Sequence, residues 1–188
     1  GGAPLVDIFK VRQGGLVFYG GFIGATLCAI FYVRKNKIPI WKMADALAPS
    51  IALGHAFGRL GCLMTGCCYG KACSLPWSIT FPRDHVTHPI AVHPTQLYES
   101  FFNFALFAGL AWIYRKKKFD GQVFALYLMA YAFLRAVNEL FRGDYEPSKH
   151  LGILTPGQLT GILIMSAGIA MWFFCSSQIR KEKLQSQE

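Results

Sequence analysis

The sequence has 188 residues, of which 53% are hydrophobic and only 15% are charged. Soluble globular domains carry about 25% charged residues, so this composition speaks against a soluble protein and for one surrounded by lipid. The formal net charge is +9, but the basic residues stand in short clusters after apolar segments rather than on polar helix faces, and we expect no nucleic-acid partner.

Five apolar segments predict membrane-spanning helices, because a helix needs about 20 apolar residues to cross a bilayer core of about 30 Å. The first and last contain no charge, the third carries only Glu99 near its start, and the second and fourth carry ionisable residues. The predicted fold class is an all-α integral membrane protein, a polytopic helical bundle in a single membrane domain over residues 1–188. In chain order the predicted spans are 16–33, 46–63, 97–114, 122–141 and 159–175.

Three basic clusters predict the orientation of these spans. They follow the first, third and fifth segments, at residues 34–37, 115–118 and 180–183. Lys and Arg are enriched at the cytoplasmic ends of membrane helices, so all three clusters and the C-terminus are expected in the cytoplasm. We therefore predict a multi-pass protein of the bacterial inner (cytoplasmic) membrane, with the loop of about 66–95 on the outer side.

Two arginines lie inside predicted spans, Arg59 in the second and Arg135 in the fourth. A charge within a membrane segment costs a few kcal/mol or more and usually faces a cavity. Because guanidinium groups bind phosphate bidentately and stay protonated, we expect the two to meet around one anionic phospholipid headgroup. The alternative is structural: Glu139, one turn after Arg135, merely neutralises it and holds helices together.

Two further motifs lie at the starts of predicted spans. The glycine-dense run G-G-L-V-F-Y-G-G at 14–21 lets a ligand or a second helix approach the backbone closely. In the run H-P-T-Q-L-Y-E at 93–99, Thr95 is expected to cap the third helix and Pro94 to fix its approach. The other polar members of that run are candidates for binding: His93, Gln96, Tyr98 and Glu99.

As a set, these motifs resemble the bacterial prolipoprotein diacylglyceryl transferases. Besides the runs at 14–21 and 93–99, the resemblance rests on G-R-L-G at 58–61 with the following Tyr69 and Gly70, on Y-A-F-L-R-A-V-N-E-L-F-R at 131–142, and more faintly on L-T-P-G-Q-L at 154–159. It implies transfer of a diacylglyceryl group from phosphatidylglycerol to the lipobox cysteine thiol of a preprolipoprotein, without a cofactor. It also implies seven helices in a full-length member, so we expect the first two to be missing here.

The resemblance also implies roles for individual residues. Arg59 and Arg135 would hold the lipid phosphate and stabilise the charge on the leaving glycerol phosphate. Many family members have a histidine, often proposed as the base, at the sixth position of the first run, where this chain has Tyr19. Tyr19 stays a catalytic candidate, but the role of the base is expected to move to His93, or else to His55, unless no base is needed. The other expected substrate-binding residues are Gly20, Gly21, Cys62, Cys67, Gly70, Gln96, Tyr98, Glu99 and Glu139.

The sequence departs from the family pattern after Arg59. The usual G-N-F-x-N-G-E appears as G-C-L-M-T-G-C, which places Cys62 at the asparagine position and Cys67 at the glutamate position. We favour a variant with the same activity over a paralogue that binds or transports phospholipid without chemistry. The cysteines at 62, 67, 68 and 73 also permit a zinc site, a disulfide or a redox function, but their spacing lacks C-x2-C pairs, so no metal ligand is assigned.

Overall fold

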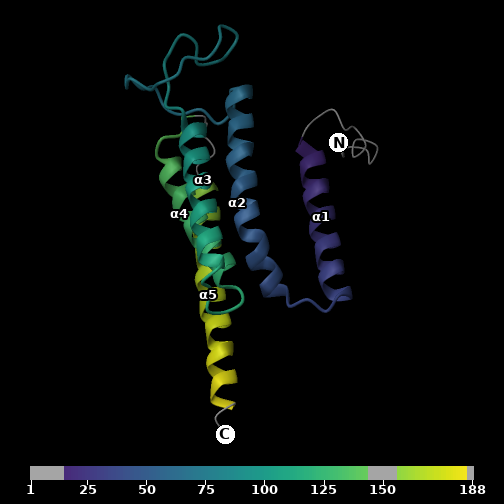
Figure 1. Ribbon diagram of the computed structural model, residues 1–188. Coiled ribbons are helices and arrows are strands. Elements are labelled where there is room, and N and C mark those ends of the chain that lie inside the picture. Colours follow the sequence, from purple (N-terminus) through teal and green to yellow (C-terminus); the bar gives the residue numbers. More distant parts are fainter. Residues whose placement is uncertain (1–14, 144–155, 186–188) are drawn as a thin grey trace. The chain divides into compact units, whose positions relative to one another are not determined.

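The computed structural model describes residues 15–143 and 156–185, and within them the chain forms five helices and isolated β-bridges but no strand (Figure 1). Each helix coincides with one of the five predicted apolar segments, which confirms the predicted all-α class. The helices are α1 (Gly15–Lys35), α2 (Ile40–Thr65), α3 (Thr95–Tyr114), α4 (Gln122–Glu139) and α5 (Pro156–Gln185).

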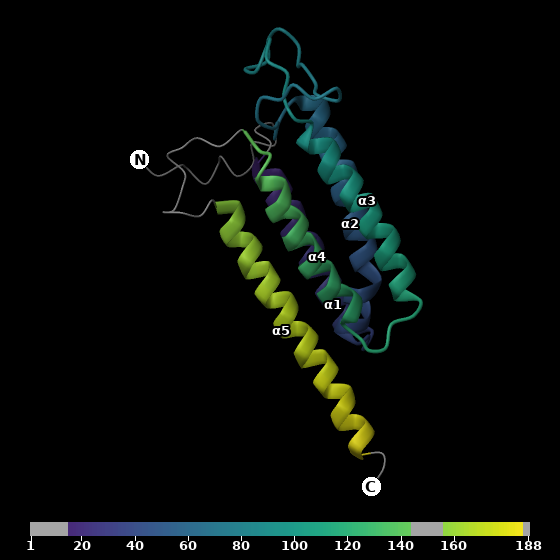
Figure 2. The same cartoon turned by 90° about the vertical axis from the view of Figure 1, so that its left-hand side faces the viewer.

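The chain divides into two units, Gly1–Met43 and Ala44–Glu188. The first contains α1 and the first residues of α2. The second contains the rest of α2 together with α3, α4 and α5, and within it α4 packs against both α3 and α5 (Figure 2). All the interacting site residues described below belong to this second unit, and the single membrane domain expected over 1–188 stays a prediction.

The interior of the second unit contains many small and polar side chains besides apolar ones such as Leu110 and Val123, whereas many large apolar side chains face outward. The buried residues on α2, α3 and α4 include Ala48, Ala52, Ala56, Glu99, Ser100, Asn103 and Asn138. A water-soluble helical bundle has the reverse pattern, with large apolar residues inside, so this distribution favours lipid surroundings. The outward-facing residues, each more than half exposed, include Phe57, Phe101, Trp112, Phe133, Leu163 and Phe173.

One stretch of the described helices, Gln158–Gln178 in α5, is long and apolar enough to cross a membrane by length and composition. The other four predicted spans are not confirmed by this criterion. Polar and ionisable residues within α2, α3 and α4, such as Arg59, Asn103 and Arg135, lower the mean hydropathy of those helices. The five-span topology therefore stays a prediction, although the five helices themselves are present.

A buried carboxylate joins α2 to the start of α4. Asp45, in the second turn of α2, has no exposed surface, and it accepts hydrogen bonds from the backbone N–H groups of Gly121 (2.8 Å) and Phe124 (2.9 Å). The Lys117 ammonium lies 3.0 Å from the same carboxylate. Partial burial acts to lower the pKa of Lys117, but its hydrogen bonds to Asp120 and Asp45 raise the pKa overall. Asp45 thus satisfies amides that a helix start leaves without partners.

The loop between α2 and α3 is tied to the end of α4. The Gly70 N–H donates to the carbonyl of His93 at 3.0 Å, and the Lys71 N–H donates to the carbonyl of Phe141 at 2.9 Å. Further along, Ile79 and Val92 form an isolated antiparallel bridge. The loop therefore lies at the end of the second unit where α2 ends, α3 begins and α4 ends (Figure 1).

Candidate functional site

Two arginines from separate helices converge on one carboxylate. Arg59 of α2 places its Nε atom 2.5 Å from Oε2 of Glu99, and Arg135 of α4 places a guanidinium nitrogen 3.2 Å from Oε1 of the same residue. Glu99 lies in the second turn of α3 and is only 5% exposed. Both guanidinium groups thus contact the same Glu99 carboxylate, and their meeting around a phospholipid headgroup stays a prediction.

Arg135 also contacts Glu139, at 3.5 Å, one helical turn further along α4. Arg135 also bonds Glu99 of α3, so its ion pairs join two helices as the structural alternative requires, and a role in binding phosphate stays a prediction. Arg59 and Glu99 lie near the end of α2 and the start of α3, and Arg135 lies near the end of α4. The helix ends thus bring all these charges to the side of the molecule that carries the 66–95 loop.

His55 adjoins the arginines. It lies one turn before Arg59 on α2, its Nδ1 atom is 3.2 Å from the Tyr127 hydroxyl, and its ring packs 4.9 Å from that of Tyr131. Tyr127 and Tyr131 stack on each other along α4. The histidine that we named second as a base therefore lies in an aromatic cluster directly beside Arg59.

His93, named first as a base, lies in the layer formed by the loop. Its Nδ1 atom is 3.2 Å from the hydroxyl of Tyr98, which also accepts a hydrogen bond from the indole N–H of Trp77 at 2.8 Å. Its ring packs 5.4 Å from that of Phe141. Gly70 approaches His93 so closely that a Cβ atom would meet the His93 Cβ at 2.5 Å, so only glycine fits there. The predicted site residues Gly70, His93 and Tyr98 thus form one contact group.

Thr95 does not cap α3, and this part of the sequence prediction is wrong. The helix begins at Thr95 itself, with Pro94 as the N-cap residue and no side-chain hydrogen bond at the cap. The Thr95 hydroxyl instead donates to the carbonyl of Cys68 at 2.6 Å. The physical reason is packing: the 66–70 segment folds onto the start of α3, so the buried hydroxyl bonds to a carbonyl of that segment rather than to its own helix.

Gln96 has a similar role. Its Nε2 atom donates to the carbonyl of Cys67 at 2.7 Å, and its Oε1 atom is buried without a hydrogen bond to any other described residue. Thr95 and Gln96 together hold the backbone of two successive cysteines against α3. The structure therefore places Gln96 beside the site as a support for the cysteine turn.

The cysteine turn, which we define as Cys62–Cys68, reverses the chain after α2. Gly66 and Cys68 both have positive φ angles, of 73° and 60°, and the Arg59 guanidinium donates to Cys68 Sγ at 3.6 Å. The Sγ atoms of Cys62, Cys67 and Cys68 all lie within 4.8 Å of one another. Burial acts to raise the pKa of the Cys67 thiol, but hydrogen bonds with Thr65, Cys62 and Cys68 lower the pKa overall.

Three predicted site residues lie in the other unit. Tyr19, Gly20 and Gly21 belong to the first two turns of α1, and their side chains are outside the described part of the structure. Their part in the site stays a prediction.

Two buried amides near the arginines were missed in the sequence. Asn103 lies one turn after Glu99, and its Nδ2 atom donates to the Glu99 carbonyl at 2.7 Å. Asn138 directly precedes Glu139 and is 4% exposed. The Oδ1 atoms of both amides are buried and make no hydrogen bond to another described residue. The signal that could have identified them is their helical spacing, four residues after Glu99 and three after Arg135.

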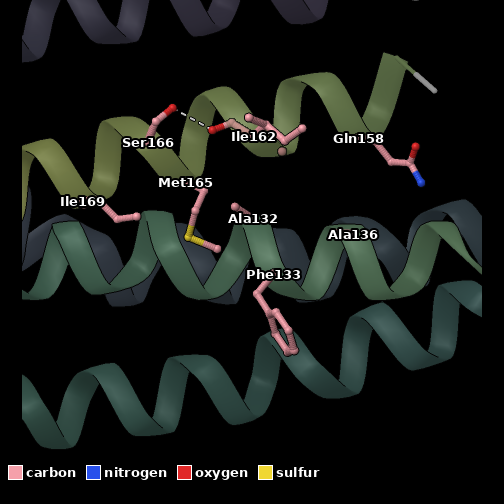
Figure 3. A pocket seen from close by; sticks show the side chains of 9 residues that line it. Ala132, Phe133, Ala136, Gln158, Ile162, Met165, Ser166 and Ile169 are labelled. Atoms are coloured by element: carbon pink, nitrogen blue, oxygen red, sulfur yellow. Dashed lines mark hydrogen bonds between the residues drawn. The ribbon is translucent and has the colours of Figure 1, made fainter. Parts of the chain in front are cut away.

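An apolar groove runs between α4 and α5, away from the charged cluster. It has a volume of about 460 Å³, and Figure 3 shows Met165 of α5 lying against Ala132 of α4. Its size and apolar lining suit a hydrocarbon chain and offer no group for chemistry. The lining residues are Ala132, Phe133, Ala136, Gln158, Gly161, Ile162, Met165, Ser166 and Ile169.

Comparison of the sequence with known proteins identifies the family to which it is similar. The family described as prolipoprotein diacylglyceryl transferase matches residues 2–174. Proteins named phosphatidylglycerol–prolipoprotein diacylglyceryl transferase are similar over most of the chain. The one from Clostridium tetani is 36% identical over 94% of this chain and 70% of its own length. The one from Finegoldia magna is 37% identical over 94% of this chain and 68% of its own length.

Proposed function

Because the chain belongs to the prolipoprotein diacylglyceryl transferase family, we propose that it transfers a diacylglyceryl group from phosphatidylglycerol to the lipobox cysteine of a preprolipoprotein in the bacterial inner membrane. The thiol sulfur forms a bond to the glyceryl carbon that carries the phosphate. The bond between that carbon and the phosphate oxygen breaks, and glycerol phosphate leaves with the electron pair. The thiol proton ends on the leaving phosphate, directly or through a base. No cofactor takes part.

The convergence of Arg59 and Arg135 on the Glu99 carboxylate carries this proposal. The two oxygens of a carboxylate and two oxygens of a phosphate have similar separations, so the two guanidinium groups are placed to bind one phosphate through two helices. Such preorganised cations stabilise the charge that develops on the leaving glycerol phosphate more than the charge of the intact lipid. The arginines therefore bind the substrate and lower the barrier.

Removal of the thiol proton needs a base or a cationic surrounding that favours the thiolate. His55, Tyr19 and His93 are the candidates, and the contacts of His55 with the α4 tyrosines beside Arg59 support it over His93. The transfer assay described below, applied to His55→Gln and His93→Gln, decides between the two histidines. If both variants kept wild-type transfer activity, neither histidine would be the base.

The remaining site residues are proposed to surround the headgroup. Cys67 and Cys62 take the positions of the family's glutamate and asparagine, and Gln96, Tyr98, Gly70 and Glu139 line the same end of the bundle. Gly20 and Gly21 of α1 are proposed to admit the lipid close to the backbone. The five helices are proposed to span the membrane with the site facing outward and the C-terminus in the cytoplasm, as the basic clusters favour.

We predict that Arg135→Ala lowers transfer by roughly 100- to 1,000-fold, because it removes one of the two cations that meet the phosphate. The measurement is the formation of a thioether adduct from labelled phosphatidylglycerol and a lipobox peptide in vesicles, together with release of glycerol phosphate. Arg115→Ala is the matched control, since Arg115 is exposed at the opposite end of α3.

Full activity of Arg135→Ala would contradict the role given to the arginines. A wild-type protein that binds phosphatidylglycerol but releases no glycerol phosphate would instead be a lipid-binding or transport paralogue.

A further inference from the structure

We propose that Cys62, Cys67 and Cys68 form a site for a thiophilic metal ion, for which Zn²⁺ is the best match. Their Sγ atoms all lie within 4.8 Å of one another. This inference goes beyond the proposed lipid transfer, with which it shares Cys62 and Cys67, and it is tested by metal affinity rather than by transfer. It differs from the sequence alternative, which counted four cysteines, because Cys73 is not a member of the group.

The distances suit a thiolate site. Zn–S bonds are about 2.3 Å long, which places the sulfur atoms of a tetrahedral site about 3.8 Å apart. The observed separations, all within 4.8 Å, are close to this value. Three sulfur ligands and no nearby hard ligand in the group select a soft ion. Cys67 is exposed, which leaves the fourth position open to water or a further ligand.

The backbone of the turn is held in place before any ion binds. Gly66 and Cys68 adopt left-handed φ angles, which for a residue such as Cys68 cost free energy and persist only where the surroundings impose them. Here the carbonyls of Cys67 and Cys68 accept hydrogen bonds from Gln96 and Thr95. A site whose scaffold is already fixed loses less conformational entropy on binding.

The charge of Arg59 suits a thiolate complex. Binding of Zn²⁺ by three thiols releases three protons and forms a complex with a net charge of about −1, whereas Cu⁺ would form one of about −2. Arg59 donates to Cys68 Sγ at 3.6 Å, so its guanidinium offsets the negative charge of the zinc complex.

Cys73 provides a matched control within the same loop. Its Sγ accepts a hydrogen bond from the Leu75 N–H at 3.4 Å, and it is partly buried, as Cys62 and Cys68 are. A site made by the three clustered cysteines requires that Cys73→Ser binds metal as well as the wild type does. If all four cysteines of the loop shared the metal, Cys73→Ser would instead bind it more weakly than the wild type does.

The experiment is a Zn²⁺ titration of the full chain, purified in detergent and fully reduced, against a chromophoric chelator. We expect one Zn²⁺ per chain, and an affinity lowered by roughly 100-fold in Cys62→Ser and in Cys68→Ser but unchanged in Cys73→Ser. Substitution with Co²⁺ should give a thiolate-to-cobalt charge-transfer band that is weaker in both cluster variants.

Three outcomes would overturn the proposal. They are the absence of stoichiometric Zn²⁺ binding by the reduced wild-type protein, an equal loss of affinity in Cys73→Ser, and a Cys62–Cys67 or Cys67–Cys68 disulfide as the native state in non-reducing mass spectrometry. The experiment measures metal affinity, so the metal site can be tested even if the protein transfers no lipid. Thermal unfolding of each variant shows that it is folded before it is titrated.

Discussion

Glu99 is the residue through which the charged cluster is assembled. Without it, Arg59 and Arg135 would be two poorly exposed cations on separate helices, and like charges at membrane depth repel strongly. With it, both guanidinium groups are oriented toward one point. A phosphate that enters the site meets donors already in place, and competes with the Glu99 carboxylate for them.

We predict that Glu99→Ala destabilises the protein by about 2–5 kcal/mol, because it removes the carboxylate from two poorly solvated arginines. The midpoint of thermal unfolding in detergent, followed by circular dichroism, should fall by roughly 5–15 °C. Asp84→Ala is the control, since Asp84 is exposed on the loop. Similar midpoints for the two variants would show that Glu99 does not hold the arginines together.

At the scale of helices, the two ends of the second unit are fastened differently. At the end that carries the 66–95 loop, Arg59, Glu99 and Arg135 join α2, α3 and α4. At the opposite end, Asp45 of α2 binds the amides at the start of α4. Between these polar contacts the helices meet through an apolar cluster in which Ala48 and Ala52 of α2 pack with larger residues of α3 and α4. The polar contacts at the two ends add directional links to this apolar packing.

We predict that Asp45→Ala costs about 2–4 kcal/mol, since it leaves buried N–H groups of Gly121 and Phe124 without an acceptor. Asp120→Ala, which also removes a carboxylate that contacts Lys117 at 2.7 Å, should cost less than about 1 kcal/mol because Asp120 is exposed and its pair is on the surface. Denaturant unfolding of the two variants side by side measures the difference. A loss from Asp120→Ala as large as that from Asp45→Ala would contradict the role of Asp45.

At the scale of the whole molecule, the distribution of side chains reverses that of a soluble protein. Phe101 is 70% exposed and Phe173 is 67% exposed, whereas Glu99 and Asp45 are buried. Lipid tails solvate large apolar side chains, while polar groups in a bilayer must find partners inside the protein. The proposed membrane-spanning topology follows from this distribution together with the basic clusters.

We predict that the loop of about 66–95 and the α3–α4 connection lie on opposite sides of the membrane. In intact cells, a membrane-impermeant maleimide should add one more label to Asp84→Cys than to the wild type, and none to Lys118→Cys. After permeabilisation, Lys118→Cys should gain its label, since both positions are exposed. A label on Lys118→Cys in intact cells beyond those of the wild type would contradict the proposed orientation.

The sequence alone determined the helices and the choice of arginines. Apolar length and polar interruptions are local properties, so they located all five helices and singled out Arg59 and Arg135 as charges that need a partner inside the protein. The motifs around those residues were sufficient to suggest the family, which the comparisons then established.

Only the tertiary structure decided which groups meet. Glu99 as the common partner of both arginines, Thr95 bonded to Cys68 rather than to its own helix, and the exclusion of Cys73 from the cysteine group all depend on how helices and loop pack. The physical reason is that helical periodicity relates residues within about two turns, whereas Arg59 and Arg135 are separated by two helix connections. Their meeting point is set by the docking of α2, α3 and α4, which no local pattern encodes.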